Sequence, residues 1–374
     1  MPEFLATCPR GLNEVLQQEI KAMGVSARDT IKSGVFFEGT WEDCYKVNLY
    51  SRIASRVVKP LLDFVAYQPE ELYEHVRSHD FTKYIDKDQT FSIDASSEES
   101  KLGDQRYVAM KVKDAIADQF TDAFGSRPDV ARENPDMIIV VKVFKNRFNI
   151  FLDTSGDSLF KRGYRMETRE APMKENLAAG LLALAEWKEE QPLIDPMCGS
   201  GTILIEAALR QKNIAPGVLR KRFGFQNLKN YNEDTWKKLV DEAIDKERED
   251  VTPILFGYDI DRKALEAARA NARRAGVDDI ITFQKENVGT LTSPIPEGVV
   301  ITNPPYGARL GDEDNLRDVY RDFSHTLKVG FKGWDAWILS GNKDLIGDLK
   351  LKSSRKHFVF NGPLECRFLK YSMR

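Results

Sequence analysis

Cysteine and histidine are scarce in this 374-residue chain, and neither type is clustered. No two cysteines form a CxxC pair, and the four histidines show no metal-ligand spacing. Neither a zinc site nor a disulfide framework is therefore indicated. We expect no metal, and we interpret the four cysteines as reduced thiols: Cys8, Cys44, Cys198 and Cys366.

Long apolar segments and excess charge are also missing. No apolar run approaches the ~20 residues that are needed to span a bilayer, and the N-terminus lacks the basic start and apolar stretch of a signal peptide. We therefore expect a cytoplasmic protein with no membrane partner. The net charge is −3, so bulk charge gives no argument for nucleic acid, and any basic surface must be local.

The first part of the chain, residues 1–165, mixes short strands and helices. This mixture predicts an α+β domain, and the full length allows a second domain with its own core. The apolar spacing predicts helices at 12–23, 42–58 and 107–124, and strands at 34–38, 91–95, 137–144 and 147–152. Lys145-Asn146 separates the last two strands, which predicts a hairpin.

Residues 166–374 follow a different plan, because strands and helices alternate there. Alternation predicts a doubly wound parallel sheet of the α/β class. The tail, HFVFNGPLECRFLKY, looks instead like two extended segments joined by Asn361-Gly362-Pro363, so a terminal antiparallel hairpin is expected.

One long insertion interrupts the alternation, between the helix TILIEAAL and the strand ILFGYDI. It holds Arg220, Lys221 and Arg222, with no acid between positions 210 and 222 and several aromatic residues after them. A basic cluster beside aromatics can hold phosphates and stack bases. A solvated loop with a helical cap on the sheet explains the same charges equally well.

A glycine-rich loop, DPMCGSGT (195–202), follows the first strand of the alternating part. Ligands of open α/β sheets bind beyond the carboxyl ends of strands, and glycines let a ligand approach the backbone. The loop lacks the third glycine of GxGxxG, because Leu204 stands there, and it lacks the lysine of a phosphate loop. It therefore favours a nucleoside cofactor without a pyrophosphate.

Polar side chains end the next two strands. Asp259 closes the strand FGYD, where a carboxylate can accept hydrogen bonds from both hydroxyls of a ribose. Its alternative role is to cap the following helix. Asn287 closes the third strand, where its amide could bind an adenine edge, or could simply make a turn.

The tetrapeptide Asn303-Pro304-Pro305-Tyr306 follows a later strand. The prolines restrict the backbone, so Asn303 is held in a defined direction. Its side-chain oxygen and the Pro304 carbonyl can accept hydrogen bonds from a substrate NH2, and Tyr306 can stack on a planar ring. Such a site aligns an amine for attack on a methyl sulfonium without a strong base. The alternative is a surface turn.

These motifs resemble those of a known family. Residues 190–374 resemble a class I S-adenosylmethionine-dependent methyltransferase with an amino-directed (N/D)PP(Y/F/W) motif. Nearly the whole chain is similar to the bacterial THUMP-domain 23S rRNA guanine 2-amino methyltransferases, through FLATCPRGLNEVLQQEIKAMG, FLDTSGDSLFKRGYR, APMKENLAAGLL, DPMCGSGT and TNPPYGARLG. The resemblance implies a ferredoxin-like and THUMP RNA-binding domain over 1–165 and a Rossmann-like methyltransferase domain over 166–374.

The resemblance also implies roles for individual residues. S-adenosylmethionine would be the cofactor, and its contacts would be Asp195, Gly199, Gly201, Thr202, Asp259 and Asn287. Asn287 departs from many relatives, which have aspartate there. Asn303, Pro304 and Tyr306 would form the catalytic loop. The second methyltransferase domain that some relatives carry is absent, so we expect one reaction only.

RNA is the implied partner, either 23S rRNA or an assembly intermediate. Residues 140–170 have a local basic bias that is compatible with phosphate contact. Lys161 and Arg162 lie in it and join Arg220, Lys221 and Arg222 as candidate RNA contacts. Two alternatives stay open: an N-methyltransferase for another planar amine, in DNA adenine or protein glutamine, and a non-catalytic RNA-binding ribosome assembly factor.

Overall fold

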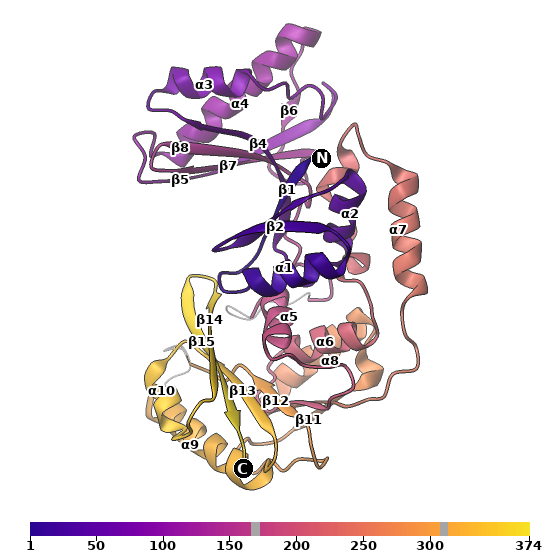
Figure 1. The fold of residues 1–374 in the computed structure, drawn as a ribbon, viewed down its shortest axis with the longest axis vertical. Coiled ribbons are helices and arrows are strands. Elements are labelled where there is room, and N and C mark those ends of the chain that lie inside the picture. Colours follow the sequence, from indigo (N-terminus) through magenta and orange to yellow (C-terminus); the bar gives the residue numbers. More distant parts are fainter. Residues whose placement is uncertain (166–172, 307–312) are drawn as a thin grey trace.

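The computed structural model describes residues 1–165, 173–306 and 313–374 of the chain. Within these residues the strands form two sheets, one in each half of the sequence (Figure 1). The predicted division at 165/166 falls beside residues 166–172, which lie outside the described part. No helix in the described ranges combines the length and the apolar character needed to cross a membrane.

The N-terminal sheet has the strand order β2-β3-β1-β4-β8-β7-β5-β6. Its strands are β1 (Glu3–Thr7), β2 (Ser26–Ile31), β3 (Gly34–Glu38), β4 (Arg56–Val65), β5 (Thr90–Glu98), β6 (Asp129–Val130), β7 (Met137–Phe144) and β8 (Arg147–Asp153). The helices are α1 (Asn13–Ala22), α2 (Trp41–Tyr50), α3 (Pro69–Arg77) and α4 (Gln105–Phe124). The long strand β4 pairs with β1 and with β8, and so joins two smaller α+β units.

The C-terminal sheet has the order β11-β10-β9-β12-β13-β15-β14. Its strands are β9 (Leu193–Asp195), β10 (Leu255–Asp259), β11 (Ile281–Lys285), β12 (Val299–Thr302), β13 (Asp335–Ser340), β14 (Arg355–Asn361) and β15 (Leu364–Ser372). Strands β9 to β13 pair in parallel, whereas β15 is antiparallel to β13 and β14. This arrangement confirms the doubly wound sheet with a terminal antiparallel hairpin. The strand order reverses between β9 and β12, where such folds bind ligands.

Helices cover both faces of this sheet. They are α5 (Glu175–Leu184), α6 (Thr202–Gln211), α8 (Arg262–Ala275), α9 (Glu313–Gly330) and α10 (Lys343–Asp348). The insertion adds α7 (Glu233–Asp245) and the 3-10 turns η1 (Pro216–Leu219) and η2 (Gly224–Asn227), and a third 3-10 turn, η3 (Asp278–Ile280), follows α8. Helices α5, α6 and α8 belong to a large core that also includes the N-terminal half. Helices α9 and α10 pack in a second core on the other face of the sheet.

Local sequence explains several element boundaries. Lys145 and Asn146 have φ of 49° and 65°, the left-handed pair that a two-residue hairpin requires, and they confirm the turn between β7 and β8. The predicted helix 42–58 was wrong in its second half, because α2 ends at Tyr50 and β4 begins at Arg56. Val57 and Val58 pair with β1 there, and sheet pairing of β-branched residues overrides the helical spacing.

The insertion packs against the N-terminal half. The helical cap on the sheet, one of the two alternatives for this segment, is therefore not what the structure has. The Phe225 ring stacks on Tyr45 of α2 at 4.4 Å between centroids, and Trp236 contacts the same tyrosine edge-on. The Tyr50 hydroxyl donates to the Leu239 carbonyl of α7 at 3.5 Å. These aromatic side chains fill the junction between the halves, so they build the core and are not free to stack on bases.

Candidate active site

A cavity of about 1410 Å³ opens at the carboxyl edge of the C-terminal sheet. It lies where β9 and β12 diverge and extends over the first turn of α6 and along most of α8. Eight of the nine positions predicted from the two loops and the strand ends line it: Asp195, Gly199, Thr202, Asp259, Asn287, Asn303, Pro304 and Tyr306. The structure thus brings together residues that are more than a hundred positions apart in the chain.

The two glycines of the loop have different reasons to be glycine. Both have positive φ, 54° at Gly199 and 79° at Gly201. A Cβ on Gly201 would lie 3.0 Å from the ring of Phe283 and 3.1 Å from Ala268, so a side chain there would be crowded as well as strained by the positive φ. A Cβ on Gly199 would meet nothing within 4 Å. Gly199 leaves the backbone open to the cavity, whereas Gly201, the ninth position, supports the loop from behind.

Asp259 is fixed by backbone groups on both sides. Its Oδ2 accepts the Gly199 N–H at 2.9 Å, and its Oδ1 accepts the Asp261 N–H at 2.9 Å. Each carboxylate oxygen keeps further acceptor capacity. The helix cap is a different residue, because Asp261 accepts the Lys263 N–H at the start of α8. Asp259 is therefore oriented at the cavity wall and can accept hydrogen bonds from a ligand.

Asp195 ties the glycine loop to the end of β12. The Thr302 hydroxyl donates to its Oδ1 at 2.7 Å, and the Met197 N–H lies 3.3 Å from the same oxygen. The carboxyl is almost completely buried, and this desolvation raises the pKa of Asp195 to about 7. The Thr302 bond sets the distance between the glycine loop and the adjacent Asn303.

Asn303 carries the most unusual polar atom of the site. Its side-chain Oδ1 is buried and has no hydrogen-bond partner among the residues that the structure describes. An acceptor left in that state costs about 1–3 kcal/mol, and buried polar atoms are nearly always paired. Because Asn303 lines the cavity, its oxygen can be satisfied by an N–H of a ligand.

Tyr306 lies between this loop and the β14–β15 hairpin. Its hydroxyl accepts from Asn361 Nδ2 at 3.2 Å, and Cys366 Sγ lies 3.9 Å from it. Burial raises the pKa of Tyr306 to about 12, so the phenol is neutral near pH 7. The Asn361 contact was not predicted, because the two residues are 55 positions apart and belong to no common motif.

Asn287 stands at the exposed rim of the cavity. Its Oδ1 accepts the Gly289 N–H at 2.8 Å, so the turn role that the sequence left open is observed. An amide oxygen can accept a second hydrogen bond, and contact with an adenine remains a prediction.

Arg165 is a further residue that sequence reasoning did not place in this site. Its guanidinium donates to the Thr202 hydroxyl at the start of α6 and to the Met173 carbonyl. Glu175 of α5 lies 3.7 Å from it. Arg165 therefore fixes the helix that follows the glycine loop, and a lone arginine in a basic segment gave no sequence signal for that task.

Two of the predicted RNA contacts are wrong. Arg162 is only 1% exposed; it donates to the carbonyls of Leu159 and Arg52 and pairs with Glu206 at 3.4 Å. A side chain so deeply buried cannot reach a phosphate. Its neighbour Lys161 is exposed and keeps the predicted role open.

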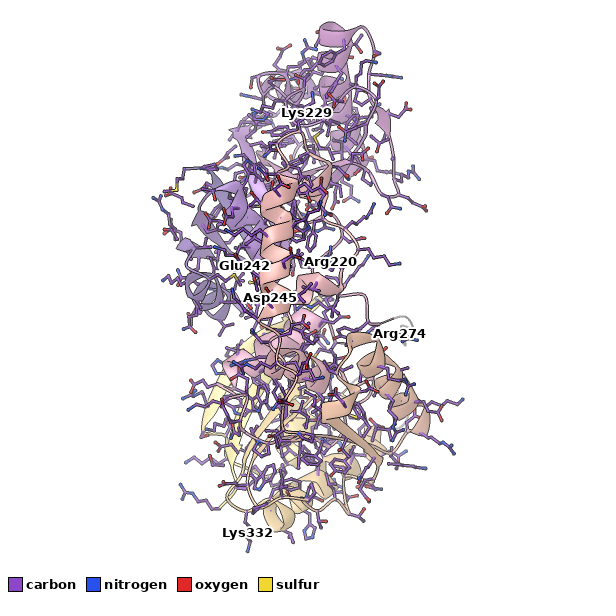
Figure 2. The ribbon with its side chains drawn as sticks, turned by 90° about the vertical axis from the view of Figure 1, so that its right-hand side faces the viewer. Arg220, Lys229, Glu242, Asp245, Arg274 and Lys332 are labelled. Carbon is purple, nitrogen blue, oxygen red and sulfur yellow. The ribbon has the colours of Figure 1, made fainter. Side chains whose placement is uncertain are left out.

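Arg220 also serves the fold. Its guanidinium donates to four backbone carbonyls of the 155–161 segment, at 2.8 to 3.3 Å. Burial lowers the pKa of Arg220 to about 10. The insertion is held on the N-terminal half by this contact, whereas Lys221 and Arg222 stay exposed. Figure 2 shows Arg220 beside α7, a helix that carries the acidic residues Glu242 and Asp245.

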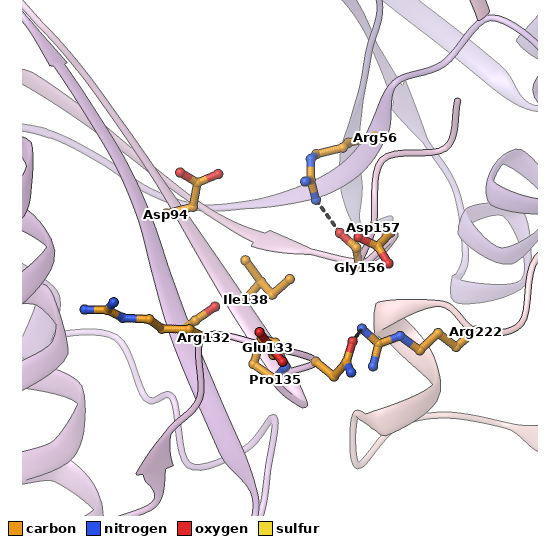
Figure 3. Close-up of a pocket in the computed structure, with 11 residues that line it drawn as sticks. Arg56, Asp94, Arg132, Glu133, Pro135, Ile138, Gly156, Asp157 and Arg222 are labelled. Carbon is orange, nitrogen blue, oxygen red and sulfur yellow. Dashed lines mark hydrogen bonds between the residues drawn. The ribbon is translucent and has the colours of Figure 1, made fainter. Parts of the chain in front are cut away.

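A second, smaller cavity of about 380 Å³ lies between the insertion and the N-terminal sheet. Figure 3 shows Arg56, Arg132 and Arg222 around it, and Arg222 donates to the Asn134 side chain across it. Three acids line the same cavity, so its formal charges balance: Asp94, Glu133 and Asp157. Among the described residues, no group of three or more histidine, cysteine or acidic side chains is placed to hold a metal ion.

Three family models match successive parts of the chain. Residues 3–58 match the RlmL ferredoxin-like domain, residues 66–153 match the THUMP domain, and residues 162–370 match the RMKL-like methyltransferase domain. The third match alone covers more than half of the chain.

Relatives and solved structures agree with these matches. Ribosomal RNA large subunit methyltransferase K/L from Methylococcus capsulatus is 41% identical over 99% of this chain and 51% of its own length. The chain spans about half the length of the curated relatives it matches.

Several solved structures align with the full chain. The crystal structure of SMU.472, a proposed methyltransferase complexed with SAH, has a TM-score of 0.92 at 31% identity and covers 100% of this chain and 98% of that one. A predicted N6-adenine-specific DNA methylase from Listeria monocytogenes has a TM-score of 0.89 at 30% identity and covers 100% and 96%.

Proposed function

Because the chain belongs to the RMKL-like methyltransferase family and carries a THUMP domain, we propose that it transfers a methyl group from S-adenosylmethionine to the 2-amino group of a guanosine in 23S ribosomal RNA. The observation that carries this proposal is the Oδ1 of Asn303 in the cavity beside Asp259, which is buried and has no hydrogen-bond partner within residues 1–165, 173–306 and 313–374. Within the described part of the chain that oxygen has no donor, so an amine of the substrate can supply one.

The residues of the cavity fit the cofactor. When bound, S-adenosylmethionine supplies a methyl group that is activated by a sulfonium. Asp259, already oriented by two backbone N–H groups, would accept the ribose hydroxyls. Gly199 leaves room for close approach, and the helix that begins at Thr202 presents backbone N–H groups. Asn287 would contact the adenine at the rim.

The catalytic task of the protein is alignment. Asn303 Oδ1 and the Pro304 carbonyl would accept hydrogen bonds from the guanosine amine and direct its lone pair toward the methyl group. The Tyr306 ring would stack on the base, and its neutral phenol adds no charge. Alignment of this kind can lower a barrier by roughly 7–11 kcal/mol. The Thr302–Asp195 bond supports it because it joins the two loops.

RNA binding would rest on the N-terminal half and on the exposed part of the insertion. Lys161, Lys221 and Arg222 remain the candidate phosphate contacts. We propose that the division into an RNA-binding part and a methyltransferase part falls at 165/166 and that the protein acts in the cytoplasm. Both free 23S rRNA and an assembly intermediate are compatible substrates.

One comparison favours a second candidate. The Listeria relative is named an adenine-specific DNA methylase, and the Asn303 acceptor would also bind an adenine 6-amino group. The THUMP match over residues 66–153 favours RNA over DNA, because the family resemblance implies that this domain binds RNA.

The test is transfer of a labelled methyl group to three substrates: deproteinised 23S rRNA, large-subunit precursor particles and genomic DNA. Nucleosides from each are then separated and identified by mass spectrometry. We expect 2-methylguanosine from RNA, and none with the Asn303→Ala variant. Labelled 6-methyladenine from DNA would replace the guanosine assignment, and no transfer to any substrate would reject the methyltransferase.

A further inference from the structure

The loop Pro9–Gly11 of the N-terminal half touches the β14–β15 hairpin of the C-terminal sheet. In Figure 1 the hairpin reaches up to the region of α1. The Phe360 N–H donates to the Arg10 carbonyl at 3.1 Å. The Arg10 guanidinium lies over the Phe360 ring, 4.9 Å from its centroid. A backbone bond and a cation–π contact thus join the two halves at one residue.

The contact is tight on both sides of the loop. Gly11 has φ of 89°, and a Cβ there would lie 2.0 Å from the Phe358 carbonyl oxygen. On the other side, a Cβ on Gly180 of α5 would lie 2.4 Å from Leu12 Cδ1. The chain at 11–12 is therefore wedged between the hairpin and α5, and the hairpin cannot shift toward it.

The far side of the same hairpin faces the cavity. Asn361 follows Phe360 directly, and its Nδ2 donates to the Tyr306 hydroxyl. Asn361, Pro363 and Leu364 line the cavity together with Tyr306. One side of β14 is thus bound to the N-terminal loop, and the next residue holds the ring of the proposed catalytic loop.

We propose that the Pro9–Gly11 loop positions Tyr306 through the hairpin, with Asn361 as the positioning residue. This inference rests on the proposed function, because Tyr306 is there the ring that stacks on the target base. Through this link, the position of the RNA-binding half affects how the Tyr306 ring aligns the target base. Loosening it should lower kcat more than cofactor affinity, since alignment is what Tyr306 contributes.

The first test compares two glycine variants of the N-terminal half. Gly11→Ala introduces the clash with Phe358, whereas Gly24→Ala also places a side chain at positive φ, 79°, but meets nothing within 4 Å. We expect Gly11→Ala to lower kcat roughly tenfold or more with unchanged cofactor affinity, and Gly24→Ala to keep it. Equal kcat values in the two variants would overturn the proposal.

The second test addresses the link itself and does not need Gly11→Ala to fold. Asn361→Ala should lower kcat by roughly three- to tenfold, the equivalent of one lost hydrogen bond. In a Tyr306→Phe background the same change should have little effect, because the hydroxyl that Asn361 binds is gone. Additive losses would show that Asn361 acts independently of Tyr306.

A spectroscopic readout separates this proposal from the proposed function. Tyrosines are replaced by 3-fluorotyrosine, and the Tyr306 fluorine signal is assigned as the one that Tyr306→Phe lacks. It should shift in Gly11→Ala and Asn361→Ala and stay in place in Gly24→Ala. An unmoved signal in Gly11→Ala overturns the positioning link even if RNA is methylated. A shifted signal in a protein that methylates no RNA supports the link and rejects only the function.

Discussion

The cavity and the insertion use their charged side chains in opposite ways. At the cavity, Asp259 receives two backbone N–H groups and still has acceptor capacity facing open space. In the insertion, Arg220 donates to backbone carbonyls of the 155–161 segment. In that segment's own continuation, Arg162 donates to a backbone carbonyl and pairs with the buried Glu206. Hydrogen-bonding capacity that the protein itself leaves unused therefore distinguishes a ligand site from a structural charge, whereas charge and sequence clustering do not.

The sharpest way to break this comparison is to truncate Arg162. Arg162→Ala leaves Glu206 buried without its cation, and an uncompensated buried charge costs about 3–5 kcal/mol. The exposed neighbour gives the control, since Lys161→Ala should change stability by no more than about 0.5 kcal/mol. Urea-unfolding midpoints measure both. Equal midpoints would mean that the Arg162–Glu206 pair does not stabilise the fold, and the contrast with the cavity would fail.

The next effect concerns Asn303 and catalysis. Asn303→Ala should lower kcat by on the order of a hundredfold, because the lost acceptor acts on the aligned amine. Fold and cofactor affinity should be retained, as checked by thermal unfolding and calorimetry. Asn230→Ala, at an exposed asparagine outside the cavity, is the matched control and should keep kcat. Near-normal turnover by Asn303→Ala would mean that the tetrapeptide 303–306 is only a structural turn and has no catalytic role.

Asp259 gives a smaller effect on binding. Asp259→Ala should weaken S-adenosylmethionine binding by roughly 1.5–3 kcal/mol, the contribution of a hydrogen bond to a charged group. Glu266→Ala removes an exposed carboxylate from the same cavity wall and should leave affinity unchanged. Isothermal calorimetry compares the two. Equal affinities would remove Asp259 from the cofactor site.

The smallest expected effect concerns RNA binding by the exposed basic residues of the insertion. Replacing Lys221 and Arg222 by glutamine should lower RNA affinity and reduce the slope of log K against log salt by about 1 per lost phosphate contact. The control changes Lys237 and Lys238, exposed lysines on the acid-rich helix α7 of the same insertion. Filter binding over a salt series measures both. If the control lowers the slope equally, the effect is only net charge.

The sequence predicted the cavity well because its motifs stand at strand ends. The 3.6- and 2-residue spacing places those ends at one edge of a sheet, and the topology then brings Asp195, Asp259 and Asn303 together. Arg162 and Arg220 could not be classified, because a buried arginine and an exposed one look alike in a basic run. Asn361 was missed for a different reason, since its contact with Tyr306 depends on the register of a hairpin.

The continuous core has a consequence for how this protein can change over evolutionary time. Leu12 fills the space that Gly180 leaves on α5, and Phe225 of the insertion stacks on Tyr45 of α2. The contact surfaces of the two halves are therefore complementary in shape. A chimaera with another family member would need the residues on both sides of this interface exchanged together. New target specificity is more accessible through the rim and the hairpin tip than through the exchange of whole domains.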